Sequence, residues 1–339
     1  MEKFVSSWAN GEKLPESYVF PPGKRPGKVA VTTSKNVPVI DIGKAKGVDR
    51  STIIQQIIQA SQDFGFFQVI NHGVPSKILD ETRGVFEDFF ALPAEEKEDL
   101  CSSDVSKNCI FLTSNVDYDK EEIHNWRDSL RLNCAPLEEC RQDWTLKPAR
   151  FRDVVGDYII EITNLGSRIL ELICEGLGLE QGYFTKDMSQ QQILSVHHYP
   201  PCPDPSLTLG TRSHSDIGLM AILLQGDVPG LQVLKDGEWI GVEAIPDAFV
   251  VNIGYVLQFI SNGKLLSVEH RAVTNKDKSR ISAAFFTAPA NECVVQPAKA
   301  IVNAENPPIY KSFRYADFVK TFRAAYVGEI DNVLGKYTI

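Results

Sequence analysis

The chain has 339 residues, of which 43% are hydrophobic and 23% charged, a composition typical of globular proteins that excludes a disordered or fibrous chain. Its 44 acidic and 35 basic residues give a formal net charge of −9, with the two signs interspersed. A nucleic-acid binder needs a basic stripe to neutralise phosphates. No such stripe is visible, so we expect no nucleic-acid partner.

The sequence also predicts a protein that is neither secreted nor inserted in a membrane. The first eleven residues lack an apolar core behind a basic flank, and the longest apolar stretch, around residues 217–224, is too short to span a bilayer. The seven cysteines are scattered, odd in number and without a C-x-x-C pair, which favours reduced thiols over a disulfide framework or a zinc knuckle. We therefore expect a cytoplasmic monomer.

The N-terminal half predicts an arm followed by a mainly helical region. Residues 1–36 are rich in Pro, Gly and Lys, which is typical of an extended arm rather than a core element. In residues 37–180 apolar residues mostly recur at helical spacing, and this region is expected to pack on the core. The strands and helices expected in it lie at about residues 37–42 and 66–70 (strands) and 51–64, 76–90, 94–97 and 150–175 (helices).

The pattern then changes from a period of 3.6 to a period of 2. Turn signals such as Pro229-Gly230 and Asn262-Gly263 separate short strand candidates. These strands are expected at about residues 193–199, 219–224, 230–234, 238–242, 248–253, 268–274 and 280–288. Many short strands with such punctuation indicate a double-stranded β-helix, or jelly roll, over residues 190–290. The fold class is then mainly β with α: one folding unit in which N-terminal helices and a C-terminal helix in 291–339 brace the jelly roll.

Two histidines and a carboxylate form the candidate metal site. His214 and Asp216 are two residues apart, so on a strand end or tight turn they project to the same side. His270 lies on a later predicted strand that sheet pairing could bring alongside. Two histidines and one carboxylate on one face can hold Fe(II) and leave positions open for substrate and O₂. The H-x-D string alone also matches by chance, so the interpretation depends on its context.

The context is an arginine and a hydroxyl on the next strand. Arg280 and Ser282 would share one face of that strand, where a guanidinium fork and a hydroxyl suit a carboxylate. The strand contains no acidic residue, and a buried arginine without an anionic partner would be costly. Tyr199, which begins a Tyr-Pro-Pro-Cys-Pro segment, offers a further donor. A carboxylate co-substrate would supply the missing anion.

The order His214-Ser215-Asp216, His270, Arg280-Ile281-Ser282 resembles the Fe(II)/2-oxoglutarate oxygenases. Over about residues 37–328 the wider pattern is similar to the plant small-molecule branch of that family. The motifs that carry this likeness are those at 63–73 (DFGFFQVINHG), 90–93 (FALP), 126–128 (WRD), 198–203 (HYPPCP) and 247–249 (DAF). Within the branch the chain is most similar to the hyoscyamine, salicylate and mugineic-acid hydroxylases, a likeness that residues 305–311 strengthen.

The resemblance implies a reaction and a set of site residues. A dioxygenase of this kind couples oxidative decarboxylation of 2-oxoglutarate by O₂, giving succinate and CO₂, to the hydroxylation or related oxidation of a small specialised metabolite such as an alkaloid or a phenolic. Ascorbate is expected as reductant. The residues so implied are His214, Asp216 and His270 for Fe(II), and Arg280, Ser282 and Tyr199 for 2-oxoglutarate.

Three alternatives stay open at this stage. The reaction could be desaturation, ring closure or demethylation, because these begin with the same hydrogen abstraction as hydroxylation. A 2-oxoglutarate-independent oxidase of the same fold would also keep the Arg-x-Ser signal. A catalytically silent ligand-binding jelly roll would instead have lost part of the metal triad, which is complete here.

The residues that contact the substrate are the part of the site that the sequence predicts least well. By the geometry of the family, Phe286 points toward the reacting centre, and the region from Phe111 to Trp126 forms part of the mouth. Ordinary core packing is an equal alternative for these aromatics and for Tyr255. Such a pocket would suit a small ring compound, and the acidic residues within 117–122 either favour a cation or form solvated loop surface.

Four histidines fall outside the metal pattern, and one of them, His198, belongs to the HYPPCP motif. His197 stands where much of the branch has asparagine, and it either orients groups around the metal or, as we favour, is a satisfied core histidine. His72 and His124 are expected to be structural or exposed.

Overall fold

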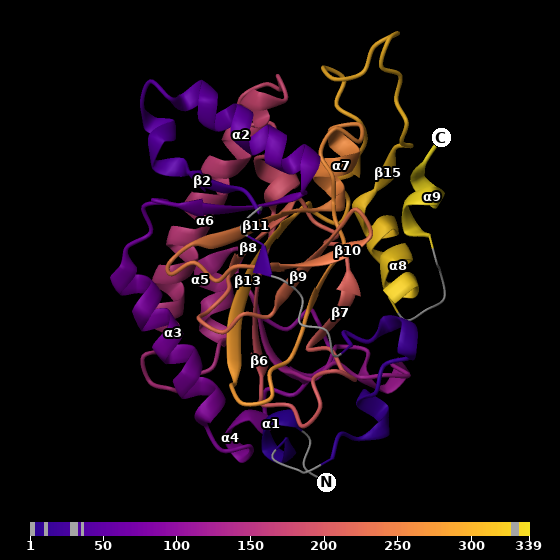
Figure 1. The fold of residues 1–339 in the computed structure, drawn as a ribbon. Helices are drawn as coiled ribbons and strands as arrows, with labels where there is room; N and C mark the ends of the chain where they lie inside the picture. The colour runs from indigo at the N-terminus through magenta and orange to yellow at the C-terminus, as the bar shows by residue number, and fades with distance from the viewer. Residues whose placement is uncertain (1–3, 10–12, 28–32, 35–36, 327–331) are drawn as a thin grey trace.

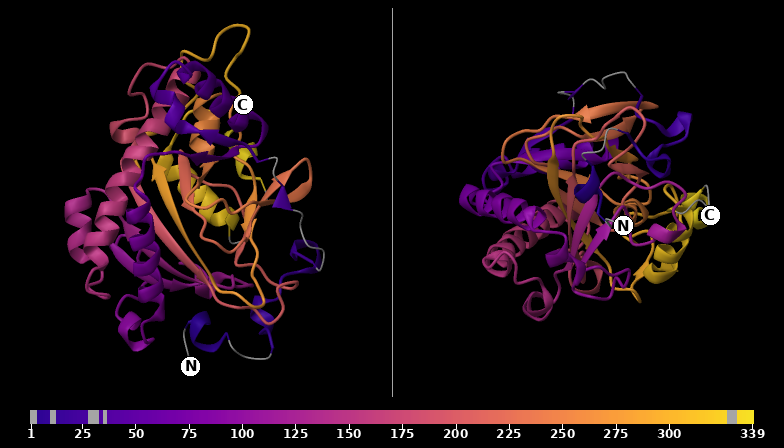
Figure 2. Two further views of the ribbon diagram at one scale, coloured as in Figure 1. Left: turned by 60° about the vertical axis from the view of Figure 1, so that its left-hand side comes forward. Right: turned by 90° about the horizontal axis from the view of Figure 1, so that it is seen from below.

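The computed structural model describes residues 4–9, 13–27, 33–34, 37–326 and 332–339. Two β-sheets face each other at the centre of this part of the chain, and long helices cover the outer face of the larger sheet (Figures 1 and 2). This arrangement confirms the predicted jelly roll with bracing helices. The space between the sheets is where the candidate site lies.

The strands of the two sheets come from distant parts of the chain. The larger sheet has the order β2 (Val39–Asp41), β3 (Phe66–Ile70), β11 (Phe249–Ile253), β8 (Met220–Leu224), β13 (Arg280–Ala288), β6 (Gln191–Tyr199), β5 (Asp128–Asn133) and β4 (Cys109–Thr113). The smaller has the order β1 (Thr33–Ser34), β10 (Glu238–Val242), β9 (Leu231–Lys235), β12 (His270–Ala272) and β7 (Thr211–His214). A short ribbon pairs β14 (Val294–Val295) with β15 (Phe313–Arg314).

The helices form two groups around these sheets (Figure 1). The group on the outer face of the larger sheet contains α2 (Arg50–Asp63), α3 (Ser76–Ala91), the short α4 (Glu95–Glu98) and α5 (Leu137–Cys140), and α6 (Phe151–Gly176). The C-terminal group contains α7 (Tyr255–Ile260), α8 (Tyr315–Tyr326) and α9 (Val333–Tyr337). At the N-terminus α1 (Val5–Trp8) lies against the lower end of the strands.

Alternate residues of the larger sheet pack against the helices. Leu194 and Val196 of β6 and Phe285 of β13 belong to the same buried cluster as Ile162 and Leu165 of α6. Side chains in a strand alternate between its two faces. The residues between these apolar ones therefore point inward, toward the smaller sheet.

The register of β13, β6 and β5 arranges the inward-facing residues in rows. Each row crosses the three strands at one level, and successive rows are about 7 Å apart along the strands. The rows are Ser282–His197–Ser129, Ala284–Ser195–Arg131 and Phe286–Ile193–Asn133. Polar side chains thus line the inner face next to an apolar outer face.

Part of the N-terminal segment belongs to the core, although its composition predicts an extended arm rather than a core element. Phe4 and Val5 are buried, and the carboxylate of Asp128 accepts hydrogen bonds from the backbone N–H groups of Val5 (3.0 Å) and Ser6 (2.8 Å). Further along, Tyr18 packs on Trp126. The prediction was wrong for these residues because their apolar side chains follow no period, and only the tertiary fold brings Asp128 to them. Residues 21–24 are exposed, whereas 28–32 and 35–36 lie outside the described residues.

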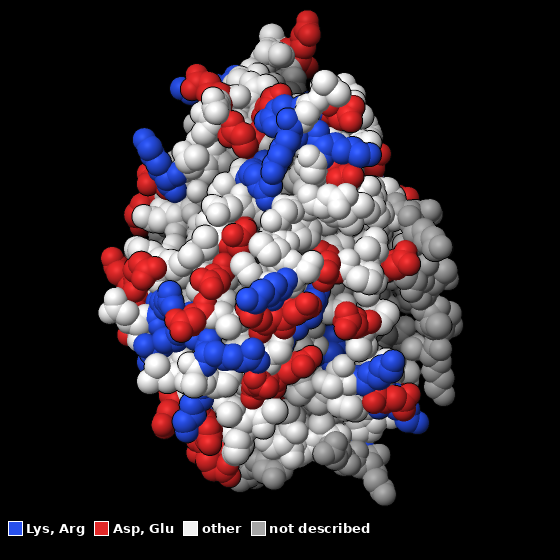
Figure 3. All heavy atoms as spheres, turned by 90° about the vertical axis from the view of Figure 1, so that its left-hand side faces the viewer, with Lys and Arg blue, Asp and Glu red and all other residues white. Residues whose placement is uncertain are grey.

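Figure 3 shows that lysine and arginine are interspersed with aspartate and glutamate on the helical side of the molecule. Ion pairs such as Arg150–Asp88 (2.8 Å) and Arg50–Glu175 (2.8 Å) link the helices there. Among the described residues, no helix combines the length and the apolar character that crossing a bilayer requires. None of the seven cysteines, all of which lie in the described part of the chain, forms a disulfide.

Replacing Phe4 by alanine tests whether the N-terminal segment is part of the fold. We expect Phe4→Ala to lower the free energy of unfolding by about 3 kcal/mol, because it leaves a cavity beside Phe111. Urea denaturation followed by tryptophan fluorescence measures this change. The exposed Glu16→Gln in the same segment is the control and should change nothing. An unaltered midpoint for Phe4→Ala would contradict the packing described above.

Candidate metal and co-substrate site

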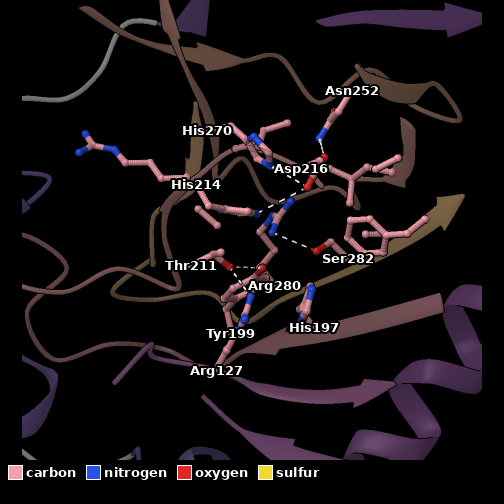
Figure 4. Close-up of a pocket in the computed structure, with 17 residues that line it drawn as sticks. Arg127, His197, Tyr199, Thr211, His214, Asp216, Asn252, His270, Arg280 and Ser282 are labelled. Atoms are coloured by element: carbon pink, nitrogen blue, oxygen red, sulfur yellow. Dashed lines mark hydrogen bonds and ion pairs between the residues drawn. The ribbon is translucent and has the colours of Figure 1, made fainter. Parts of the chain in front are cut away.

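Three potential metal ligands converge between the two sheets. His214 ends β7, His270 begins β12, and the two residues are direct partners in the pairing of these strands. Asp216 follows β7 by two residues. One potential ligand atom from each lies within 4.8 Å of the other two. The three residues that the sequence predicted as ligands are therefore brought together (Figure 4).

The hydrogen bonds of the two histidines leave one nitrogen of each turned toward the carboxylate. His214 donates from Nδ1 to the carbonyl of Arg212 (3.0 Å), and His270 donates from Nδ1 to the carbonyl of Val268 (3.2 Å). This fixes the tautomer and leaves each Nε2 as an acceptor. The two Nε2 atoms lie 3.7 and 3.8 Å from Oδ1 of Asp216.

The electrostatic environment keeps His214 neutral. Burial and the neighbouring His270 lower its pKa to about 4, although Asp216 acts in the opposite direction. A neutral imidazole is the form that binds a metal. Two neutral imidazoles and one carboxylate oxygen are the donor set of a non-haem Fe(II) centre with open positions, so these residues fit that ion.

The carboxylate of Asp216 is positioned by its surroundings. Oδ2 accepts a hydrogen bond from Nδ2 of Asn252 on β11 (3.2 Å), which leaves Oδ1 for an ion. The backbone carbonyl of Asp216 accepts a hydrogen bond from the N–H of Tyr255 (2.8 Å). The chain approaches closely here: a Cβ at Gly254 would lie 2.2 Å from the carbonyl oxygen of Gly218, so glycine is required.

A buried arginine occupies the other end of the same cavity. The guanidinium of Arg280 donates from Nε to the carbonyl of Val228 (3.0 Å) and from Nη1 to Oγ of Ser282 (3.2 Å). Its side chain is almost inaccessible to solvent, and it forms no ion pair among the described residues. Burial lowers the pKa of this guanidinium, and Tyr199, whose ring centroid is 5.1 Å away, opposes the change. The arrangement leaves a desolvated cation without an anion.

Tyr199 and Arg127 complete the polar wall beside Arg280. The hydroxyls of Tyr199 and Thr211 are 3.1 Å apart, and Arg127 donates to the same Thr211 hydroxyl (2.6 Å). Burial raises the pKa of the Tyr199 phenol, but Arg280 and Arg127 outweigh that effect and lower it overall. Neither Arg127 nor Thr211 was assigned a role from the sequence, although Arg127 lies in the Trp-Arg-Asp motif.

His197 occupies the inner face opposite Ser282. Its Nδ1 lies 2.8 Å from the hydroxyl of Ser129, and the ring lines both cavities described below. Burial, followed by the charges of Arg127 and Arg280, lowers its pKa well below the usual value, so the ring is neutral. The histidine is hydrogen-bonded as expected, but it belongs to the cavity wall rather than to a closed core.

Two connected cavities contain these groups. An inner cavity of about 70 Å³ includes the metal ligands, Arg280, Ser282 and Tyr199 (Figure 4). An outer cavity of about 1090 Å³ adjoins it, between strands of the larger sheet and α8. Arg127, His197 and Phe286 line both. The three candidate metal ligands and Arg280 thus face one small space, and the outer cavity has the volume of a site for a small organic molecule.

Of the aromatics considered as substrate contacts, only Phe286 lies in the cavities. Phe111 packs on Phe89 and Phe90 in the core, because Leu112, one position later, takes the inward-facing place on β4. Tyr255 packs its ring on Phe318 of α8 and does not line either cavity. For these two residues the core-packing alternative is the one observed. Residues 114–116 do form part of the wall, as the family's geometry suggested.

The remaining polar residues have structural roles. His72 donates from Nε2 to the carbonyl of Asp247 (2.6 Å) and accepts from the N–H of Val74 (3.1 Å), and His124 stacks on Tyr118. Both are buried rather than exposed. The carboxylate of Glu121 is buried as well, and forms an ion pair with Arg212 (3.1 Å).

The fold and the donor set define a non-haem iron oxygenase, and comparison with known proteins agrees. Residues 190–289 match the 2OG-Fe(II) oxygenase superfamily, and residues 37–151 match the non-haem dioxygenase in morphine synthesis N-terminal family. The chain is 45% identical over 325 residues to Protein DOWNY MILDEW RESISTANCE 6 of Arabidopsis thaliana, with 94% of each chain covered. It is 41% identical over 333 residues to hyoscyamine 6-dioxygenase of Hyoscyamus niger, with 95% of each covered.

A solved structure shows the same architecture. The crystal structure of JOX2 in complex with 2OG, Fe and JA aligns with a TM-score of 0.84 at 34% identity, covering 94% of this chain and 93% of that one. The chain therefore belongs to the Fe(II)/2-oxoglutarate-dependent oxygenases. It is a dioxygenase related to the enzymes of plant specialised metabolism, with Fe(II) and 2-oxoglutarate as its cofactor and co-substrate.

Substitutions in the metal cluster test its geometry. We expect Asp216→Ala to abolish Fe(II) binding, because it removes the only anionic ligand, and Asn252→Ala to weaken it by about 10- to 100-fold, because Asp216 loses its orienting hydrogen bond. Metal content after dialysis against graded Fe(II) under nitrogen measures both effects. His198→Gln, on the outer face of β6, is the histidine control and should bind iron normally. Equal iron content in the Asn252 variant and the parent protein would argue against the positioning role.

Proposed function

We propose that His214, Asp216 and His270 hold Fe(II), and that 2-oxoglutarate binds with its far carboxylate on Arg280 and Ser282, with Tyr199 beside it. One observation carries this proposal: a buried guanidinium with no anionic partner among the described residues shares a small cavity with the three-ligand cluster. A dicarboxylate that spans the cavity would supply both a metal ligand and the missing anion.

The bound iron would supply the activation of O₂ that oxidatively decarboxylates 2-oxoglutarate to succinate and CO₂, leaving one oxygen atom for the substrate. The protein's residues do the rest. Arg280 and Ser282 fix the far end of the co-substrate, and Nδ1 of each histidine holds its ring through a backbone carbonyl. Ala221, Leu223 and Ala284 form an apolar wall that excludes water from the inner cavity.

We infer that the second substrate is a small specialised metabolite that occupies the outer cavity and is hydroxylated at a carbon next to Phe286. The position of Phe286 in both cavities supports this placement, because the two substrates must meet there. The relatives' names support the size class: one is a hyoscyamine 6-dioxygenase and another a flavanone 3-dioxygenase.

We further propose that the enzyme is a cytoplasmic monomer that uses ascorbate to keep its iron reduced. The seven thiols without a disulfide support a reducing compartment, which an Fe(II) site requires. Gel filtration and fluorescent fusion of the full chain test the oligomeric state and the location, and omission of ascorbate tests its contribution to repeated turnover.

The decisive experiment is a product screen with the iron-loaded enzyme. Small alkaloids and phenolics are incubated with 2-oxoglutarate and ascorbate, and mass spectrometry follows the gain of one oxygen together with succinate. We expect equal amounts of succinate and oxidised product. Product formation without 2-oxoglutarate would instead indicate the co-substrate-independent oxidase, and unchanged product formation by His270→Ala would place the chemistry elsewhere.

The arginine assignment has its own test. We expect Arg280→Ala to weaken 2-oxoglutarate binding by about 2–5 kcal/mol, since it removes the buried partner of a carboxylate, while Fe(II) binding persists. Calorimetric titration of 2-oxoglutarate into the iron-loaded protein under nitrogen measures the first, and titration of Fe(II) into the metal-free protein measures the second. Arg314→Ala, an exposed arginine paired with Glu292 and Asp317, serves as control. An unchanged affinity in the Arg280 variant would refute the assignment.

A further inference from the structure

The charge of the outer cavity has one sign. Four basic side chains line it: Arg127, Arg131, Lys320 and Arg323. Among the described residues that form the wall, none is an aspartate or a glutamate. The chain as a whole has a net charge of −9, so a cavity whose charged lining residues are all basic differs from the rest of the molecule. Such a lining attracts anions and repels cations.

Arg131 is partly buried in the wall of this cavity, whereas Arg127 is buried. Arg131 faces inward from β5, in the row that contains Ser195 and Ala284. Its Nη1 donates to the carbonyl of Val105 (3.0 Å), and it forms no ion pair among the described residues. Burial and the neighbouring charge of Arg323 lower its pKa to about 10. Two like charges are thus held near each other with no carboxylate between them.

Arg323 and Lys320 approach from the opposite side. Both lie on α8, three residues apart, so they share one face of that helix with Val319, which also lines the cavity. Neither forms a hydrogen bond or ion pair within the part of the chain that the structure describes. The sheet and the helix therefore present cations to the same space.

We propose that the substrate of this enzyme is an anion, a small ring compound with a carboxylate that binds between Arg131 and Arg323. This inference rests on the proposed function and names its substrate class. The apolar part of the molecule would lie on Ile193, Ile217 and Phe286, which line the cavity toward the metal ligands. The carboxylate would take the place of the missing counter-ion, as planar guanidinium forks favour.

The sheet register sets the separation between the two anion sites. From Ser282 to Arg131 is one row along the strands, about 7 Å, and two strands across, about 10 Å. A carboxylate at Arg131 is therefore distinct from the one proposed at Arg280. A substrate of one ring and a short side chain would reach from Arg131 to the iron end of the cavity.

The acidic residues at 117–122 do not make the cavity suitable for a cation. Glu121 forms an ion pair with Arg212, Asp117 forms one with Lys120, and neither lines the cavity. The possibility that this cluster favours a cationic substrate is therefore not supported by the structure.

Matched ligands that differ only in charge provide the test. Cinnamate, cinnamamide and cinnamylamine, with benzoate and benzamide as a shorter pair, are titrated into the iron-loaded enzyme under nitrogen and followed by calorimetry. 2-Oxoglutarate is present at saturation, so that it occupies Arg280 and the added acid cannot bind there. We expect at least one acid to bind about 10- to 100-fold more tightly than its amide, and the amine to bind worst.

Two variants assign that preference to its residues. Arg131→Gln and Arg323→Gln should each weaken binding of the acid by about 10-fold or more and leave the amide and 2-oxoglutarate unchanged. Lys299→Gln removes the same charge from an exposed site outside the cavity and should have no effect. Because Arg323 lies on the exposed side of α8, its variant keeps the test valid if the Arg131 variant folds poorly.

The outcomes separate this inference from the proposed function. Equal binding of acid and amide, binding of no acid in the panel, or tightest binding of the amine would overturn the anionic substrate. So would variants that weaken acid and amide alike. If 2-oxoglutarate still binds and is converted to succinate in those cases, the proposed function stands and only the substrate class is wrong. Loss of 2-oxoglutarate conversion in the parent enzyme would instead contradict the proposed function itself.

Discussion

The antiparallel register of β13, β6 and β5 is the constraint on which the rest of the site depends. Because side chains alternate along a strand, Arg280, Ser282 and Phe286 face the cavity while Phe285 faces the helices. A slip of one residue would bury Arg280 against α6 and expose Phe285 to the ligand space. Burial of each large apolar side chain on the outer face stabilises the fold by about 1.5–3 kcal/mol. The packing of the helices therefore holds the catalytic face in place.

Unpaired charge is the second property of this interior. Arg280 and Arg131 are desolvated cations that lack a carboxylate partner among the described residues, an arrangement that lowers stability in the absence of ligand. The metal end instead gathers one carboxylate and two imidazoles. Binding of anions and of a metal cation, as proposed above, would offset these charges. Arg280 and Arg131 lie on the larger sheet, whereas His214 and His270 lie on the smaller sheet that faces it.

The metal end and the substrate end are built by different parts of the chain. Strands β7, β12 and β13 carry the candidate histidine ligands and Arg280, whereas the outer cavity is lined mainly by β4, β5, β6 and α8, and Phe286 of β13 lines both cavities. Changes in the outer elements can alter the substrate without moving the iron ligands. This division explains how a family with one reaction includes relatives named for substrates as different as a flavanone and hyoscyamine. In this chain the proposed substrate site accordingly includes Arg131 and Arg323, which line the outer cavity.

The sequence by itself predicted the jelly roll from the period of its strands, and it predicted His214, Asp216, His270 and the Arg280–Ser282 pair as site residues from the order of motifs that it shares with a known family. It did not reveal β4, β5, β7 or α7, whose short runs show no clear period. Only the tertiary structure decided that Phe4 and Val5 join the core, that Phe111 and Tyr255 pack away from the cavity, and that Asn252 positions Asp216. The tertiary structure also brings Arg131 and Arg323 to the same cavity, although 192 positions separate them along the chain. Contacts of that kind depend on which faces of the sheet and the helix pack together, and a local sequence pattern does not specify this.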